Sequence, residues 1–247
     1  MGEEAAHDPR WGQEDRDRKA AAILATLQLH CGNDLGRGVW LDIGCGSGGI
    51  AAALSTHVER MIGMDPEPWE RWRTYRAQRS NLEFQVGGYG VLTQAVAAGS
   101  CDVVICNQVY EHVDDPPALL AAIHGVLRRG GVCYFAGPNL LWPIEPHVFW
   151  PFVHWLPRAG AQRLMRMLGS NRAADLDAWS WTSWTLTRHF RAAGFDYRSA
   201  VGERLQAGLA PSMPGLSRAL AHLPRPLFAM LTPLVPGFVF VLRKCGD

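Results

Sequence analysis

The sequence has almost no excess of charge of either sign. Its 24 lysines and arginines are balanced by 23 aspartates and glutamates, which leaves a formal net charge of +1 at pH 7. Proteins that bind nucleic acid through broad electrostatic attraction carry a clear positive excess. We therefore expect no nucleic-acid partner, and we interpret the one dense basic run, residues 71–76, as the solvated face of a helix.

Closely paired cysteines are also missing, because none of the six cysteines forms a C-x-x-C pair. This usage indicates reduced thiols in a cytoplasmic protein rather than a zinc site or a disulfide framework. The first residues, Met1–Glu4, are acidic and polar, unlike a secretory signal peptide. Both observations predict a cytoplasmic location.

A long uninterrupted apolar run is absent as well. The stretch from Pro226 to Leu242 carries no charge, but Pro226, Pro233 and Pro236 interrupt it. Since the stretch barely reaches the shortest length that spans a bilayer, we expect a pair of buried elements there instead. Peripheral contact with a membrane stays open as an alternative.

The chain does contain a glycine-rich turn directly after a short apolar strand. Residues 41–49 read LDIGCGSGG and lead into an apolar, helix-forming stretch. Glycines allow positive φ angles and let a ligand lie against the backbone. Asp42 stands two residues before the first glycine, where a carboxylate can meet a cationic group. The turn therefore predicts a site for a small molecule that carries a nucleoside and a positive charge.

Strands and helices alternate along most of the chain. This alternation predicts an α/β fold with a doubly wound, mostly parallel seven-stranded sheet, which binds ligands at the carboxyl ends of its strands. One helix is expected from Asp115, a plausible N-cap, through Arg129, with Gly130 ending it. The expected strands are residues 39–43, 60–64, 82–86, 102–106, 132–136, 195–200 and 238–242.

Two segments interrupt the alternation. Residues 139–180 contain four tryptophans and several prolines, and they are too long and too aromatic for a simple connection. We expect this segment to form an inserted cap beside the ligand site. A second insertion, residues 202–236, separates the last two strands. The whole chain, residues 1–247, is expected to fold as one domain that carries both insertions.

The glycine turn fits two known patterns. Gly44, Gly46 and Gly49 satisfy G-x-G-x-x-G, the dinucleotide fingerprint, while Asp42 with Gly44, Gly46 and Gly48 satisfies D-x-G-x-G-x-G. In the second pattern the chain resembles the class I S-adenosylmethionine-dependent methyltransferases. Three further stations follow in the family's order, and the resemblance covers roughly residues 35–138. The first station is Asp65, after the second strand. The second is residues 101–116, which resemble the fourth-strand signature of the "type 11" branch, and the third is residues 127–132, which resemble the family's turn from helix to fifth strand.

The resemblance implies S-adenosylmethionine as cofactor. In the family, glycine amides surround the methionyl part, and carboxylates at the positions of Asp42 and Asp65 attract its amino group and hold the ribose hydroxyls. The acidic residue that usually holds the adenine is replaced here by Gly88, so the adenine contact is expected from backbone or another side chain. The implied cofactor-binding residues are Asp42, Gly44, Cys45, Gly46, Gly48, Asp65, Pro66, Gly88, Tyr89, Asn107 and Gln108.

The acceptor side is expected after the fifth strand. Residues 138–147 resemble a segment in bacterial methyltransferases of this branch that belong to polysaccharide and lipid-linked sugar pathways. Glu145 or His147 is expected to act as general base for a substrate hydroxyl, and His112 completes the expected catalytic set. We therefore expect methyl transfer to a small-molecule or glycan- or lipid-linked acceptor, at oxygen first, with nitrogen or carbon as the alternative.

The pair Glu111–His112 leaves a metal site open. It resembles a cation-binding segment of ubiquinone-pathway O-methyltransferases and small-RNA terminal methyltransferases, in which another glutamate stands three residues earlier. Here that position is Gln108, a weaker ligand, so we expect no metal, although His147 could complete a partial site. Three rival functions stay open: a nicotinamide-dependent oxidoreductase, a silent module that binds the cofactor, and a membrane-surface scaffold.

Overall fold

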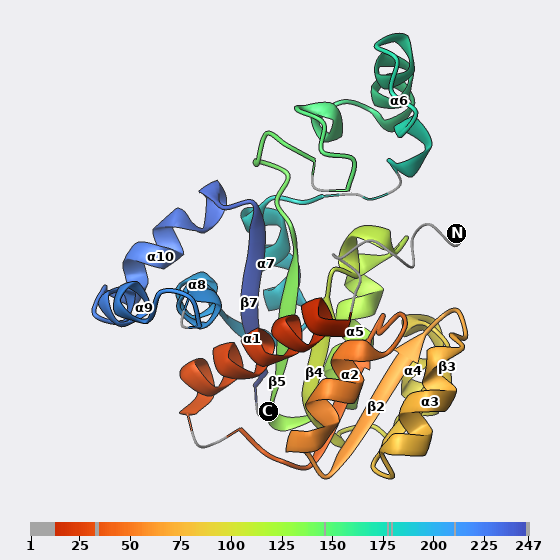
Figure 1. Cartoon of the computed structure of the whole chain (residues 1–247), viewed down its shortest axis with the longest axis vertical. Coiled ribbons are helices and arrows are strands. Elements are labelled where there is room, and N and C mark those ends of the chain that lie inside the picture. Colours follow the sequence, from red (N-terminus) through yellow and green to blue (C-terminus); the bar gives the residue numbers. More distant parts are fainter. Residues whose placement is uncertain are drawn as a thin grey trace.

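The structure is a computed structural model that describes residues 13–32, 35–145, 147–176, 178, 180–209 and 211–245. One seven-stranded sheet runs through it in the order β3-β2-β1-β4-β5-β7-β6 (Figure 1). Neighbouring strands from β3 to β5 are parallel, and β7 is antiparallel to both of its neighbours. The predicted fold class is confirmed. The strands are β1 (Val39–Ile43), β2 (Arg60–Asp65), β3 (Leu82–Val86), β4 (Cys101–Asn107), β5 (Leu127–Pro138), β6 (Phe195–Ser199) and β7 (Gly237–Lys244).

Helices cover both faces of the sheet because its central strands are apolar on both sides. One buried cluster joins the sheet to α4, α5 and α7, and a second joins it to α1, α2 and α3. Helical layers on both faces are expected for a doubly wound fold, in which ligands bind at the carboxyl ends of the strands. The helices are α1 (Gln13–Cys31), α2 (Gly49–Leu54), α3 (Arg71–Gln78), α4 (Leu92–Ala95), α5 (Pro116–Val126), α6 (Arg158–Met167), α7 (Ser183–Ala192), α8 (Val201–Leu209), α9 (Pro214–Ala221) and α10 (Arg225–Leu231).

The predicted end of α5 is wrong. The side chain of Asp115 does cap the helix by accepting from the Ala118 amide, but the helix stops at Val126, and residues 127–130 already belong to β5. The physical reason lies across the sheet. Leu127 pairs with Cys101 of β4, and the Arg128 guanidinium donates to the Asp102 carboxylate at 2.6 Å.

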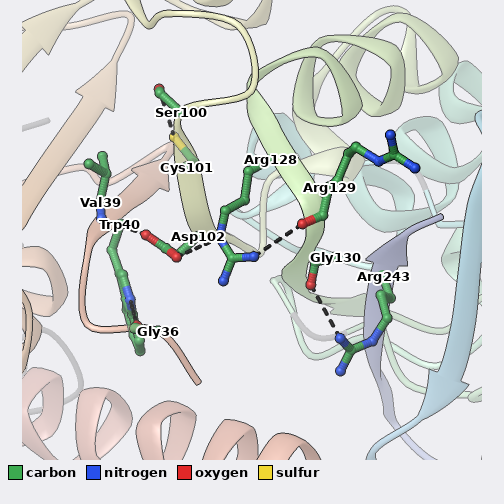
Figure 2. A network of polar contacts seen from close by, with 10 residues as sticks. All are labelled: Gly36, Val39, Trp40, Ser100, Cys101, Asp102, Arg128, Arg129, Gly130 and Arg243. Carbon is green, nitrogen blue, oxygen red and sulfur yellow. Dashed lines mark hydrogen bonds and ion pairs between the residues drawn. The ribbon is translucent and has the colours of Figure 1, made fainter. Parts of the chain in front are cut away.

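This ion pair belongs to a polar network at the amino ends of the strands (Figure 2). The second oxygen of Asp102 accepts the backbone N–H of Val39 at 2.9 Å, so one carboxylate joins the starts of β1, β4 and β5. On the far side, the Arg243 guanidinium donates to the Gly130 carbonyl at 3.2 Å. The network joins the strands at their amino ends, whereas the candidate site lies at the carboxyl ends.

Both predicted insertions contain helices. The cap segment holds α6 and a small apolar cluster of its own, built around Val148, Val153 and Met165. The second insertion holds α8, α9 and α10, and α8 packs on α1. The prediction of two buried elements within residues 226–242 is half wrong, because β7 is buried but α10 is largely exposed. Within the described part of the chain, no helix has both the length and the apolar character needed to cross a bilayer.

Candidate cofactor and acceptor site

The glycine turn after β1 has a backbone that only glycine adopts easily. Gly44, Gly46 and Gly48 have φ angles of 70°, 52° and 83°, in the left-handed region. Space imposes a second constraint. A Cβ added at Gly44 would lie 2.5 Å from Val109, and one added at Gly48 would lie 2.5 Å from the Phe84 ring. Val109 and Phe84 therefore pack closely against the turn. The turn itself follows β1 and so lies at the carboxyl ends of the parallel strands.

Asp65 at the end of β2 holds the turn from the neighbouring strand. One of its oxygens accepts the Gly46 N–H at 2.8 Å, and the other accepts the Glu67 N–H at 3.1 Å. The Gly46 carbonyl accepts the indole N–H of Trp72, whose ring stacks on Phe84 with centroids 4.9 Å apart. The carboxylate is half-buried, so it is fixed against the turn and still reachable by a ligand at the edge.

Asp42 is a buried carboxylate with an unmet need for a partner. It is 3% exposed, and its Oδ2 has no hydrogen-bond partner among the described residues. Burial raises the pKa of Asp42 to about 7, and the nearby Arg16 guanidinium counteracts only part of that increase. Arg16 comes from α1 and lies against Gly49, where an added Cβ would be 2.4 Å from its Cδ. An ammonium group on a ligand would supply a positive charge and a hydrogen-bond donor for the Asp42 carboxylate.

The remaining predicted cofactor residues line the same edge. Asn107 ends β4, and Gln108 follows it with a φ of 60° while its N–H donates to the Ala136 carbonyl at 2.8 Å. Gly88 is extended, and the nearest atom to an added Cβ is Pro66 Cγ at 3.7 Å. No side chain is excluded at Gly88, so the lack of a carboxylate there is a property of the sequence and not of the packing. Cys45, whose N–H donates to the Met64 carbonyl, and Tyr89, which follows Gly88, complete the set.

Glu145 and His147 form a tight pair in the cap. His147 Nδ1 lies 2.7 Å from Glu145 Oε1, and Oε2 of the same carboxylate accepts the backbone N–H groups of His147 and Val148. Burial by itself raises the pKa of Glu145, but the hydrogen bonds from His147 and Val148 outweigh it and the net pKa is lowered. Glu145 is only 1% exposed, whereas His147 is partly accessible. Glu145 is thus suited to orient the imidazole, and His147 is suited to meet a substrate.

The structure brings His147 together with Glu111 and His112, which follow β4. One ligand atom from each of the three residues lies within 4.8 Å of the other two, and the two imidazole rings are 5.2 Å apart at their centroids. Glu111 is completely buried, and neither carboxylate oxygen has a hydrogen-bond partner among the described residues. Burial raises its pKa to about 7. Two imidazoles and a carboxylate are a donor set that suits a divalent transition metal.

Sequence reasoning missed Arg16. The first helix was predicted, but its sequence contains several charged residues and gives no sign of which one faces the glycine turn. The unmet hydrogen-bonding need of Glu111 was also not foreseen, because burial of a side chain at the end of a strand depends on the cap that covers it.

Comparison with known proteins identifies the family. The profile of the methyltransferase domain family matches residues 13–200, which is most of the chain. The chain belongs to this methyltransferase domain family. Its predicted identity as a class I S-adenosylmethionine-dependent methyltransferase, and the predicted cofactor, are therefore confirmed. The match also decides between the two patterns of the glycine turn, against a nicotinamide cofactor.

Curated relatives of this methyltransferase domain include ubiquinone biosynthesis O-methyltransferases. The protein of that name from Acinetobacter baylyi is 31% identical over 137 residues, which are 52% of this chain and 57% of the relative. The one from Psychrobacter arcticus is 33% identical over 103 residues, 40% of each chain. The chain thus spans about half the length of these relatives or less.

Solved structures share the fold over nearly the whole chain. A Haloferax volcanii methyltransferase, in complex with the activator Trm112, has a TM-score of 0.59 at 21% identity, covering 98% of this chain and 96% of that one. A Burkholderia thailandensis 1,6-didemethyltoxoflavin N1-methyltransferase with bound S-adenosylhomocysteine has a TM-score of 0.56 at 19% identity, covering 96% and 82%. At these identities the likeness concerns the fold alone.

Proposed function

We propose that this domain transfers the methyl group of S-adenosylmethionine to a hydroxyl oxygen of a small-molecule or glycan- or lipid-linked acceptor. The observation that carries the proposal is the pair of Glu145 and His147, held at 2.7 Å in the cap and close to the carboxyl end of β4. The relatives named as O-methyltransferases support oxygen as the atom methylated. Nitrogen or carbon stays the alternative.

On the cofactor side, the roles follow from charge and geometry. Asp42 would attract the amino group of the methionyl part, because its buried carboxylate has an oxygen without a partner. Arg16 lies beside it and would meet the methionyl carboxylate. One oxygen of Asp65 already accepts the Gly46 N–H. The remaining lone pairs of the carboxylate would accept hydrogen bonds from the ribose hydroxyls. When bound, the cofactor supplies a methyl group that is already activated as a sulfonium.

On the acceptor side, His147 would remove the proton. The acceptor oxygen forms a bond to the methyl carbon while the carbon–sulfur bond breaks in line, and the hydroxyl proton passes to the imidazole. Because Nδ1 is held by Glu145, Nε2 is the nitrogen that receives the proton. Positioning of the two reactants supplies most of the rate, and a general base adds a factor of roughly 10² to 10⁴.

Replacement of His147 tests this assignment. We expect His147→Ala to lower turnover at least about a hundredfold and to leave the affinity for S-adenosylhomocysteine unchanged. Turnover is followed as S-adenosylhomocysteine formed with metabolite extracts of the source organism, and affinity is followed by calorimetry. His222→Ala, at the exposed residue that follows α9, is the matched control. Unchanged turnover in His147→Ala would remove this residue from the mechanism.

A second candidate role for the same residues is to hold a divalent cation. It is favoured by one observation, the buried and unpartnered carboxylate of Glu111 beside His112 and His147. Bound there, a cation would polarise the acceptor hydroxyl. Calorimetry with Mn²⁺ or Zn²⁺ should then detect one site that Glu111→Gln abolishes, and a chelator should lower turnover. Metal-free protein with turnover that a chelator does not change would exclude this role.

A further inference from the structure

The exposed apolar side chains of this domain are concentrated in its two insertions. Among the described residues, 21 large apolar side chains are exposed, and 17 of them lie within residues 141–168 and 205–234. Met167 and Met230 are 77% exposed, and Leu234 is 68% exposed. Apolar surface gathered in this way marks a face that meets something other than water.

The same segments carry positive charge. Residues 141–168 contain three arginines and one glutamate, the buried Glu145, and residues 205–234 contain two arginines and no aspartate or glutamate. Since the whole chain has a net charge of only +1, its negative charge is gathered elsewhere. Arg163 and Arg166 on α6 and Arg218 on α9 are exposed among these apolar side chains. A partner that fits this surface is both apolar and anionic.

Both insertions project from the same edge of the sheet. The cap follows the last residue of β5, Pro138, which pairs with Gly237, the residue at which the second insertion returns to the sheet. The Asn139 side chain joins the two bases by donating to the carbonyls of Pro233 and Val235 at 2.9 and 2.8 Å. Figure 1 shows α6 above the ends of the strands, and α9 and α10 to the left of β7.

The helices of the surface are too short to enter a bilayer end on. At 1.5 Å per residue, the eight residues of α9 and the seven of α10 span roughly 12 and 10 Å, against about 30 Å of hydrocarbon. Short helices with apolar and arginine side chains lie in the plane of the headgroups instead. We propose that the two insertions form a docking surface for a lipid bilayer that contains anionic lipids.

Docking in this way turns the carboxyl edge of the sheet, with the candidate site, toward the lipid. A lipid-linked acceptor could then reach His147 without leaving the bilayer. This orientation of the acceptor rests on the proposed function, whereas the docking itself does not. The two are tested by separate measurements, because vesicle binding is measured without methyl transfer.

The charge component is tested with the full chain and two kinds of vesicle. We expect the protein to sediment with vesicles containing roughly one third phosphatidylglycerol, and about tenfold less with phosphatidylcholine alone or at about 0.5 M salt. Arg163→Glu with Arg166→Glu should lower binding to the anionic vesicles at least about tenfold. Arg73→Glu with Arg76→Glu on α3 has the same spacing and exposure and should bind like the wild type.

The apolar component is tested with Met230→Ser combined with Leu234→Ser. This variant should bind anionic vesicles about tenfold less, while Val86→Ser, an exposed apolar residue of β3, should not. Thermal unfolding confirms that each variant is folded. Failure of the wild type to bind vesicles would overturn the docking proposal and leave the proposed function intact. Dimers in solution that Met230→Ser with Leu234→Ser dissociates, without vesicle binding, would overturn it in favour of a second copy of the chain.

Discussion

A buried carboxylate without a partner is costly, and Asp42 is the clearest example in this domain. Its pKa near 7 means that the folded protein without cofactor resists ionising this group. The cost is kept because the group is placed where the amino group of the cofactor would neutralise it. The positive charge of Arg16 lowers the pKa of Asp42, but the effect of burial is larger.

The stability of the cofactor-free protein should therefore depend on pH through Asp42. The pKa is raised from 3.8 to about 7 on folding, so the folded state holds the proton between these values and the unfolded state does not. Stability should fall as pH rises from about 4 to about 7, by up to about 4 kcal/mol, and level off above. Glu111, whose pKa burial also raises to about 7, adds a fall over nearly the same pH range. In urea unfolding, Asp42→Asn should therefore lose only the part of the fall that Asp42 contributes, and Asp114→Asn, on an exposed residue, should keep the whole fall. A wild-type profile in Asp42→Asn would contradict the assignment.

At the scale of the element, the glycine turn shows how sequence and packing act together. Positive φ angles at three glycines follow from the sequence pattern, but the contact of Gly48 with Phe84 comes from a different strand. The same applies to α5, which stops early because residues 127–130 pair with β4. Local signals place an element, and its neighbours in the sheet decide its exact end.

Two alanine substitutions separate conformation from space in the turn. Gly46→Ala adds a side chain at positive φ but with open space around it, so we expect a loss of about 1 to 2 kcal/mol. Gly48→Ala adds the same strain and also forces Phe84 to move, so it should cost clearly more and displace the Trp72 stack. Urea unfolding measures the losses, and tryptophan fluorescence detects the displacement. Equal losses would mean that Phe84 gives way freely.

At the scale of the whole molecule, one buried side chain joins two insertions that are far apart in sequence. Asn139 is 1% exposed, donates to the carbonyls of Pro233 and Val235, and accepts the Leu141 N–H at 3.0 Å. The cap and the turn before β7 therefore share one hydrogen-bonded base. The hydrogen bonds of Asn139 thus hold the bases of the two insertions next to each other, where β5 ends and β7 begins.

Asn139→Ala should loosen both insertions together. It leaves two carbonyls and one amide without partners, and we expect a loss of about 2 to 3 kcal/mol. Hydrogen exchange should accelerate in residues 147–176 and 211–236. Asn81→Ala is the matched control, because its side chain also donates to two carbonyls, those of Ser55 and Val58, on the far side of the sheet. Acceleration confined to the cap would show that the two insertions move independently.

The sequence by itself determined the sheet and its ligand edge. Strands of continuous apolar residues, each followed by a polar or glycine residue, can pack only between two helical layers, so the alternation predicts the architecture and places Asp42, Asp65 and Asn107 at one edge. The family match and the sheet order agree with that prediction. The assignment of individual cofactor and catalytic residues, and the division into one domain with two insertions, stay predictions.

Only the tertiary structure decided what surrounds those residues. Arg16 approaches the glycine turn from α1, and His147 returns from the cap to Glu111 and His112, although 35 residues separate His147 from His112. Burial without a partner, as at Asp42 and Glu111, depends on side chains from distant segments that close over the strand ends. Periodicity reports which face of an element is apolar, but long-range packing alone decides which charged groups meet, because the energy of a charge depends on everything around it.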